Sequence, residues 1–201
     1  MTAGLVVFAK APLPGRVKSR LAAGIGEPAA LAFYRRTLAE VLARLDGGGP
    51  WRARLAVTPD EAAGDGDLWP TATPRVPQGS GDVGDRMGRF LARATPEHPV
   101  VIVGSDIPDL AAAHVDRAFR ALERHGLVLG PAADGGYWSI GASAPPPAAI
   151  FDGVRWSTGH ARADTLRNAA GLAVALVDEL DDVDDLDAYG RFLARDAAAQ
   201  P

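Results

Sequence analysis

The chain has 201 residues, a length that suits one domain with a sizeable core. Its content of 47% hydrophobic and 23% charged residues excludes a disordered or fibrous protein, and its net charge of −4 argues against a general nucleic-acid binder. Without cysteine it has no disulfide framework, no thiolate metal site and no thiol nucleophile. Because no apolar run is long enough to cross a bilayer and the N-terminus lacks the basic segment of a signal peptide, we predict a cytoplasmic protein that binds neither membranes nor nucleic acid.

The first third of the sequence predicts two strands separated by a long helix. Residues 5–9 (LVVFA) form a continuous apolar run bounded by turn formers, as in a buried parallel strand. Residues 28–45 carry apolar side chains at helical spacing, with Pro28 in the first turn. Residues 54–58 predict a second strand, and the segment 59–74, rich in Gly, Pro and Asp, predicts an irregular surface excursion.

The loop after the first strand, residues 10–21 (KAPLPGRVKSRL), contains the only two lysines of the chain. Its prolines and glycine hold a non-helical turn, after which cations alternate at the start of a helix. Backbone N–H groups at a helix start, together with Lys and Arg side chains, suit a di- or triphosphate. The spacing matches neither a Walker A loop nor G-x-G-x-x-G, and a solvated basic loop is the alternative interpretation. The candidate nucleotide-binding residues in this loop are Lys10, Pro14, Gly15, Arg16, Lys18 and Arg20.

The middle of the chain adds a second candidate loop and a buried strand that ends near a carboxylate. The turn QGSGD precedes a predicted helix, and its candidate nucleotide-site residues are Gln78, Gly79 and Asp82, although a surface turn is the plainer interpretation. Residues 100–104 (VVIVG) predict the clearest buried strand. Asp106 follows that strand, where a carboxylate either holds a hard cation that bridges phosphate oxygens or only caps the turn. The spacing alone does not decide between these two roles.

A glycine pair follows the strand predicted at residues 127–130, within the segment ADGGYW. Paired glycines let a backbone approach a ligand closely and the aromatic residues could enclose it, but a plain hairpin turn has the same Asp-Gly signal. Further along, WST precedes a helix and could contact the acceptor, or it could be a buried Trp beside a capping hydroxyl. The candidate acceptor-binding residues are Gly135, Gly136, Tyr137, Trp156, Ser157 and Thr158, with Asp134 as a candidate catalytic carboxylate.

Acidic residues gather near the C-terminus, where seven of the ten residues 178–187 are Asp or Glu. They follow a strand predicted at residues 172–177 and precede a predicted helix. Such a run is usually a solvated helix start, because Asp favours N-caps and first turns. Its place after a strand also allows one member to be the second carboxylate of a metal site. Asp182 and Asp184 both fit that role, and the sequence does not separate them.

The alternation of strands and helices predicts an α/β sheet with crossover connections. No linker divides residues 1–201, so we predict a single domain. Ligands of open α/β sheets gather beyond the carboxyl ends of the strands, where the candidate segments lie, and we therefore expect one common site. The four histidines match no zinc spacing, and the absence of G-x-S-x-G gives no support to a serine hydrolase.

Six motifs occur in order along nearly the whole chain: VFAKAPLPGRVKSRL, QGSGDVGDRM, GSDIPDL, GPAADGGYW, VRWSTGHARADTL and DVDDLDAY. Together they resemble the bacterial rSAM/selenodomain-associated transferase family, whose members are described as GT-A-type glycosyltransferases. The resemblance implies an α/β chain with the GT-A, or nucleotide-diphospho-sugar transferase, fold. That fold is Rossmann-like, with a mainly parallel sheet flanked by helices.

The loop and carboxylate motifs are also distantly similar to those of 2-phospho-L-lactate guanylyltransferase and other GT-A nucleotidyltransferases. This likeness implies that Lys18 and Arg20 hold a triphosphate, that Asp106 binds Mg²⁺ (or Mn²⁺), and that Asp134 lies at the metal or acceptor end of the site. Sugar cytidylyltransferases of this fold take a second metal ligand from an Asp-Thr-Pro-Glu-Asp-Leu-like segment. The corresponding DVDDLDAY lacks the Thr-Pro, and GSDIP has one Asp where many glycosyltransferases have Asp-x-Asp.

We predict from these features an enzyme that transfers a nucleotidyl group from a nucleoside triphosphate to a small phosphorylated acceptor and releases pyrophosphate. The cationic loop favours this reaction, because a triphosphate leaving group needs positive charge. Glycosyl transfer from a nucleotide sugar is the alternative, followed by a nucleotide-binding module without catalysis. The catalytic candidates are Asp106, Lys18 and Asp134, and the metal-ligand candidates are Asp106, Asp182 and Asp184. The sequence does not identify the nucleotide base or the acceptor. It also leaves the oligomeric state open, with a homodimer as one possibility.

Overall fold

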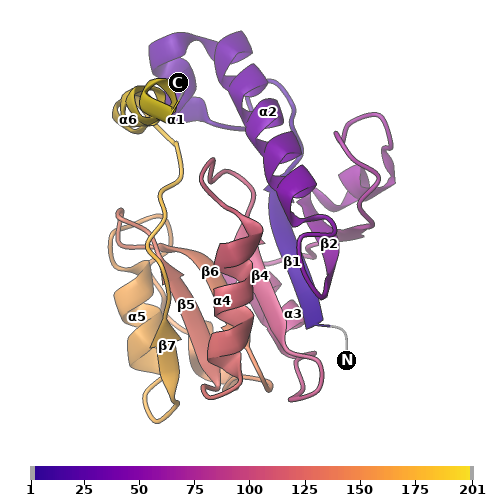
Figure 1. The fold of residues 1–201 in the computed structure, drawn as a ribbon, viewed down its shortest axis with the longest axis vertical. Helices are drawn as coiled ribbons and strands as arrows, with labels where there is room; N and C mark the ends of the chain where they lie inside the picture. Colours follow the sequence, from indigo (N-terminus) through magenta and orange to yellow (C-terminus); the bar gives the residue numbers. More distant parts are fainter. Residues whose placement is uncertain (1–2, 200–201) are drawn as a thin grey trace.

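The computed structural model describes residues 3–199. Within this range the strands form one seven-stranded sheet in the order β3-β2-β1-β4-β6-β5-β7 (Figure 1). β6 is antiparallel to both of its neighbours, β4 and β5, and the other neighbouring strands are parallel. The strands are β1 (Ala3–Lys10), β2 (Trp51–Thr58), β3 (Arg75–Pro77), β4 (Val100–Gly104), β5 (Leu127–Pro131), β6 (Tyr137–Ala142) and β7 (Val174–Leu176).

Both faces of the sheet are covered, which explains why its central strands are continuous apolar runs. On one face, Leu38 of α2 and Val115 of α4 belong to the same buried cluster as Val7 of β1. On the other face, Phe90 of α3 belongs to a cluster with Ile102 of β4, and η2 and α5 also pack there. The helical segments are α1 (Ser19–Ile25), α2 (Glu27–Leu45), η1 (Asp60–Gly64), α3 (Val83–Leu91), α4 (Ala112–Leu122), η2 (Ala148–Phe151), α5 (Ala161–Asn168) and α6 (Leu186–Ala199).

The last helix, α6, lies beside α1 and away from β7, the strand that precedes it (Figure 1). A third apolar cluster joins α6 to α1 and α2, and Phe33 of α2 is its largest buried side chain. The ring centroid of Phe33 lies 5.1 Å from that of Tyr189 and 5.5 Å from that of Phe192, both of α6. The extended segment between β7 and α6 therefore returns the acidic residues 181–185 to the loop of residues 10–21.

The predicted α/β organisation is confirmed, with each predicted strand present at or near its expected position. The sequence did not predict β3 or β6. β6 begins at Tyr137 within the segment ADGGYW, and the Asp-Gly pair forms the hairpin turn that was its alternative interpretation, with the Ala132 N–H donating to the Gly136 carbonyl at 3.1 Å. The chain therefore turns straight back from β5 to run antiparallel beside it.

The predicted surface excursion at residues 59–74 is only partly at the surface. Trp69 within it is buried, and its indole Nε1 donates a hydrogen bond of 2.8 Å to the Ala62 carbonyl. A large aromatic side chain and a hydrogen-bond partner thus anchor this segment to the core. No helix within residues 3–199 is both long enough and apolar enough to span a membrane.

Candidate active site

Several candidate residues meet at one edge of the sheet, beyond the carboxyl ends of its strands. Lys10 ends β1, Asp106 follows β4, Asp134 follows β5, and the segment after β7 brings Asp182 and Asp184 to the same place. Parallel strands present their carboxyl ends at one edge, and the extended path to α6 supplies the last two carboxylates. The common site expected from the sequence is therefore a geometric feature of the fold.

Lys18 is an internal cation of this site, and its side chain is only 3% exposed. Its backbone has φ of 51°, in the left-handed region, at the N-cap of α1. The ammonium Nζ donates to Asp106 Oδ2 at 2.8 Å and to Asp184 Oδ1 at 2.6 Å. Burial disfavours the charge on Lys18, but the two carboxylates outweigh burial and raise its pKa, so the lysine stays protonated.

The carboxylates of Asp106, Asp182 and Asp184 each place an oxygen within 4.8 Å of the others. Arg20 also donates to Asp184, from Nη2 to Oδ2 at 2.7 Å. Burial disfavours ionisation of Asp184, but Lys18 and Arg20 outweigh it and lower the pKa of this carboxyl. At Asp182, burial and then the negative charges of Asp184 and Asp106 raise the pKa.

This acidic cluster, defined as Asp106, Asp182 and Asp184, fits a hard divalent cation. Its donors are carboxylate oxygens, the ligands that Mg²⁺ and Mn²⁺ prefer. The Lys18 ammonium contacts Asp106 and Asp184, whereas burial and then the negative charges of these two neighbours raise the pKa of Asp182. The structure places both Asp182 and Asp184 in the cluster, and Asp184 is the one that Lys18 and Arg20 bind.

A cavity of about 730 Å³, the basic cleft, lies on one side of Asp106. Five of the predicted nucleotide-site residues line it: Lys10, Arg16, Lys18, Arg20 and Gln78. Arg86 of α3 also lines the cleft and was not predicted, although it lies one helical turn after Asp82 in the motif QGSGDVGDRM. Its Nη1 is 3.3 Å from Thr58 Oγ1, which directs the guanidinium toward the end of β2.

Tyr34 and Gln78 shape the floor of the basic cleft by joining strand ends. The Tyr34 hydroxyl accepts from the Lys10 N–H at 3.1 Å and donates to the Lys10 carbonyl at 2.9 Å. Burial raises the pKa of Tyr34 to about 12, so it remains protonated. The Gln78 amide Nε2 donates to the carbonyls of Ala9 and Ala56 at 3.2 and 2.9 Å. Gln78 therefore ties β1 to β2, in addition to lining the cleft.

Other predicted nucleotide-site residues lie outside the lining of the cleft. Pro14 and Gly15 shape the turn before Lys18, with Gly15 at φ of 67°. The Gly79 N–H donates to the Asp60 carboxylate at 2.9 Å. Asp82 caps α3, since its Oδ1 accepts from the Asp85 N–H at 2.9 Å. These residues form the local frame around the cleft.

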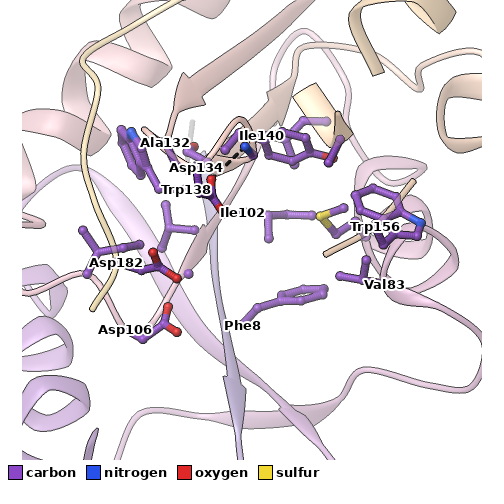
Figure 2. Close-up of a pocket in the computed structure, with 18 of the residues that line it drawn as sticks. Phe8, Val83, Ile102, Asp106, Ala132, Asp134, Trp138, Ile140, Trp156 and Asp182 are labelled. Carbon is purple, nitrogen blue, oxygen red and sulfur yellow. Dashed lines mark hydrogen bonds between the residues drawn. The ribbon is translucent and has the colours of Figure 1, made fainter. Parts of the chain in front are cut away.

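On the other side of Asp106 lies the apolar cavity, with a volume of about 250 Å³. Figure 2 shows the carboxyl groups of Asp106 and Asp182 near each other at one side of it, with Phe8 and Trp156 on the other side. The predicted residues that line it are Asp106, Asp134, Gly136, Tyr137, Trp156, Ser157, Thr158 and Asp182. The cavity and the basic cleft share Asp106 and Trp156, so they form adjoining parts of one site.

The glycine pair after β5 lets the Asp134 turn pack against the loop that carries Trp156. A Cβ on Gly135, whose φ is 84°, would lie 2.3 Å from the Gly159 carbonyl oxygen, so only glycine allows this approach. The Gly136 N–H donates to Asp134 Oδ1 at 2.8 Å. Gly135 itself lies outside the cavity lining, and its contribution is to hold the two loops together.

Two polar atoms beside the apolar cavity lack hydrogen-bond partners among residues 3–199. They are Ser139 Oγ and Trp156 Nε1, both buried, and both residues line the cavity. A buried polar atom without a partner is costly, so such atoms mark places where a ligand can complete the hydrogen bonding. By contrast, the Tyr137 hydroxyl is 3.4 Å from Thr165 Oγ1, and burial raises its pKa.

The family described as "Uncharacterized protein conserved in bacteria (DUF2064)" matches residues 41–158, more than half of the chain. No curated protein matches the sequence. Among solved structures, a candidate nucleotide-diphospho-sugar transferase from Desulfovibrio desulfuricans G20 is 29% identical, with a TM-score of 0.85 over 100% of this chain and 90% of that one. The comparison extends the resemblance beyond the matched family segment to the whole chain.

Two further solved structures share the fold at low identity. The 4-diphosphocytidyl-2C-methyl-D-erythritol synthase from Anaerococcus prevotii DSM 20548 is 10% identical, with a TM-score of 0.61 over 100% of this chain and 99% of that one. CMP:2-keto-3-deoxy-manno-octonic acid synthetase, solved with CTP, is 11% identical, with a TM-score of 0.51 over 98% and 99%. The predicted nucleotide-diphospho-sugar transferase fold is therefore confirmed.

Proposed function

This chain belongs to the DUF2064 family of bacterial proteins, and we propose that it is a divalent-cation-dependent transferase that moves a nucleotidyl group from a nucleoside triphosphate to a small phosphorylated acceptor. The observation that carries the proposal is the junction at Asp106, where the basic cleft, the acidic cluster and the apolar cavity meet. In this proposal residues 1–201 act as one transferase domain in the cytoplasm. The transferases that share its fold support the reaction class.

The basic cleft suits the triphosphate of the donor. Lys10, Arg16 and Arg20 line it together with Arg86, and these side chains can neutralise the β- and γ-phosphates. Lys18 lies at the boundary between the cleft and the acidic cluster, so it can hold the carboxylates in place and face a phosphate oxygen at once. The chain thereby surrounds the leaving group with positive charge.

Asp106, Asp182 and Asp184 would hold a divalent cation, which would supply charge to neutralise the reacting phosphate oxygens. In the transfer, an oxygen of the acceptor phosphate attacks the α-phosphorus, and the bond from that phosphorus to the bridging oxygen breaks. Pyrophosphate leaves with the electron pair of that bond. The attacking phosphate is already ionised, so the residues of the chain act by binding and aligning the two substrates.

Glycosyl transfer is a second candidate, supported by the 29% identical structure that is described as a nucleotide-diphospho-sugar transferase. In that reaction an acceptor hydroxyl oxygen attacks the anomeric carbon, and the bond from that carbon to the nucleoside diphosphate breaks. Asp134, at the wall of the apolar cavity, would take the hydroxyl proton. The same cleft would then hold a diphosphate.

The products distinguish these reactions. The protein is incubated with Mg²⁺, with nucleoside triphosphates or nucleotide sugars, and with a panel of phosphorylated and hydroxyl acceptors, and pyrophosphate and nucleoside diphosphate are assayed. We expect acceptor-dependent pyrophosphate release. Nucleoside diphosphate without pyrophosphate would instead establish glycosyl transfer, and nucleotide binding with neither product would favour a binding module.

Asp106→Asn tests the junction itself and is expected to lower turnover by about a hundredfold or more, since it removes a cation ligand and a partner of Lys18. Asp109→Asn is the matched control: Asp109 is exposed and pairs with Arg195 at 3.0 Å. It should retain the parent rate in the same pyrophosphate assay. Turnover by Asp106→Asn at the parent rate would remove Asp106 from the mechanism.

A further inference from the structure

The two parts of the site carry opposite charge. The basic cleft is lined by Lys10, Arg16, Arg20 and Arg86 as well as Lys18. The lining of the apolar cavity, as far as residues 3–199 form it, contains no Lys or Arg and carries the carboxylates of Asp106, Asp134 and Asp182. A free anionic group on the acceptor body inside the apolar cavity would therefore lie among like charges, with no Lys or Arg of this lining to balance it.

Apart from the hydroxyl groups of Ser139, Ser157 and Thr158, the remaining walls of the cavity are largely hydrophobic, and their aromatic rings pack against one another. Phe8 packs edge-on against Phe90, with their centroids 5.4 Å apart. Trp156 lies 5.7 Å from Phe151 and 6.4 Å from Tyr137, centroid to centroid. Because these rings are held in place by their contacts with one another, the cavity is a preformed space and its shape can select a ligand. Figure 2 shows that this apolar part begins beside the carboxyl groups of Asp106 and Asp182.

From this division we infer that the acceptor has an uncharged, largely apolar body that fills the apolar cavity, while its phosphate lies at Asp106 and faces the basic cleft. The inference rests on the proposed nucleotidyl transfer and specifies its substrate class. Burial of an apolar body removes hydrocarbon from water and adds no charge beside the cavity carboxylates, so Asp106 and Asp182 stay free to hold the cation. Small polyol phosphates and phosphorylated acids lack such a body.

In this inference the donor's base lies in the basic cleft and not in the apolar cavity. The basic cleft is the larger space and has hydrogen-bonding side chains from Thr58, Gln78 and Ser105. Trp156 Nε1 and Ser139 Oγ, which have no partner among the described residues, each offer the acceptor body a hydrogen bond. An apolar ring or short chain with one or two oxygen substituents matches these features.

Two acceptors of similar size and equal reacting group test the inference: benzyl phosphate and glycerol 3-phosphate. Binding of each is measured by calorimetry to the full chain with Mg²⁺ and a nucleoside triphosphate whose α,β-bridge is a methylene group, so that no transfer occurs. We expect benzyl phosphate to bind at least about tenfold more tightly, as for the gain of apolar groups in a hydrophobic pocket. Equal binding, tighter binding of glycerol 3-phosphate, or binding of neither overturns the inference.

Met87 lines the apolar cavity but not the basic cleft, and it therefore allows a matched pair of variants. Met87→Gln should weaken benzyl phosphate binding by about fivefold or more, whereas Met87→Leu, which keeps the wall apolar and conserves volume, should stay within about twofold of the parent. Both should bind the donor analogue as the parent does. If Met87→Gln weakens donor binding and leaves benzyl phosphate unaffected, the base occupies the cavity and the inference is wrong.

Pyrophosphate assays with a transferable triphosphate separate the inference from the proposed function. Release with glycerol 3-phosphate but not with benzyl phosphate would keep nucleotidyl transfer and overturn the apolar acceptor. Selective benzyl phosphate binding without pyrophosphate from any triphosphate would keep the apolar acceptor and overturn nucleotidyl transfer. The comparison of the two acceptors uses the unmodified chain, so it holds even if Met87→Gln folds poorly.

Discussion

Lys18 adopts a left-handed backbone conformation that residues other than glycine rarely take, with φ of 51° and ψ of 41°. This conformation costs about 1–2 kcal/mol in an ordinary residue. Two charge-assisted hydrogen bonds, to Asp106 and Asp184, offset the cost. The strain lies at the centre of the candidate site, where it turns a lysine of a surface loop into an internal counter-ion of the acidic cluster.

Removal of the ammonium group by Lys18→Ala should therefore have two separable effects. Without added cation, Asp106 and Asp184 lose a counter-charge, so the unfolding midpoint should fall. Added Mg²⁺ should then raise the midpoint more than in the parent, because the cation replaces the missing charge. Nucleotide binding should weaken by about tenfold or more. Thermal unfolding with and without Mg²⁺, and calorimetry with a nucleoside triphosphate, measure these effects.

Lys10→Ala provides the matched control, because Lys10 lines the same cleft but is exposed at the end of β1. It should weaken nucleotide binding while the unfolding midpoint and its response to Mg²⁺ stay close to those of the parent. If both variants respond to Mg²⁺ alike, Lys18 does not share its carboxylates with a cation.

At the scale of elements, α5 holds the loop that carries Trp156 and Ser157 through one buried carboxylate. Asp164 is only 2% exposed and accepts hydrogen bonds of 2.8 Å from Arg155 Nε, Arg155 Nη2 and Arg167 Nη2. It also accepts from the Arg155 N–H at 3.1 Å. The carboxylate therefore anchors the backbone directly before Trp156, and that anchor sets the position of the cavity wall.

Asp164→Asn should destabilise the fold in a pH-dependent way. The hydrogen bonds from Arg155, with those from Arg167, lower the pKa of Asp164 below its ordinary value of 3.8. A carboxyl whose pKa is lowered in the folded state stabilises the fold at every pH above its unfolded-state pKa. This stabilisation is lost as the pH falls through the lowered, folded-state pKa. The difference in urea midpoint between parent and variant should thus be constant from pH 8 to pH 5 and shrink at pH 3.

Asp116→Asn controls for the loss of an acidic residue, since Asp116 forms an exposed pair with Arg120 on α4. Exposed ion pairs of this kind contribute little to the free energy of unfolding, so the urea midpoint of Asp116→Asn should stay near that of the parent at every pH. A midpoint difference for Asp164→Asn that does not change between pH 7 and pH 3 would show that the ionised carboxylate is not what anchors the loop.

Sequence patterns predicted five of the seven strands and the loops that follow them, because a buried parallel strand leaves a continuous apolar run and its carboxyl end faces the ligand edge. The side-chain geometry was not predictable in the same way. Lys18 has a left-handed backbone, with φ of 51°, that no neighbouring residue type signals, and its ammonium contacts Asp106 and Asp184. Asp182 and Asp184 lie on a segment without helical or strand periodicity, so no face distinguishes them.

The apolar cavity was the other feature that the sequence did not reveal. Phe8, Ile102 and Ile140 lie in strands, where an apolar residue is expected in the core. Ile102 and Ile140 are members of one buried cluster, and Phe8 packs against that cluster. Only the arrangement of β1, β4 and β6 leaves a space between them and Trp156. The antiparallel β6, which follows a hairpin, was not predicted, and so neither was the wall that it forms.

At the scale of the whole molecule, the acidic cluster joins two separately packed regions. Asp106 follows β4 of the sheet, whereas Asp182 and Asp184 lie on the segment that α6 holds through its cluster with α1 and α2. Figure 1 shows α6 beside α1, at a distance from β7. Loss of the α6 contacts should therefore disturb cation binding without any change to the carboxylates themselves.

Phe33→Ala tests this dependence. Phe33 is 4% exposed and is edge-on to both Tyr189 and Phe192 of α6. Its truncation should lower the free energy of unfolding by about 3–5 kcal/mol if α6 unfolds with the rest of the chain, and by less if α6 detaches first. In either case the segment that carries Asp182 and Asp184 gains freedom, so Mg²⁺ should bind more weakly at temperatures where the variant is folded.

The control for Phe33→Ala must lose stability without touching that segment, and Phe119→Ala meets this condition. Phe119 of α4 stacks on Trp51 with centroids 5.8 Å apart, on the face of the sheet that α2 and α4 cover. Its loss should lower the urea midpoint yet leave the Mg²⁺ affinity, measured by calorimetry, at the parent value. If the two variants bind Mg²⁺ equally well, the carboxylates of the acidic cluster are held by the sheet and the loop of residues 10–21 alone, and α6 does not contribute to the cation site.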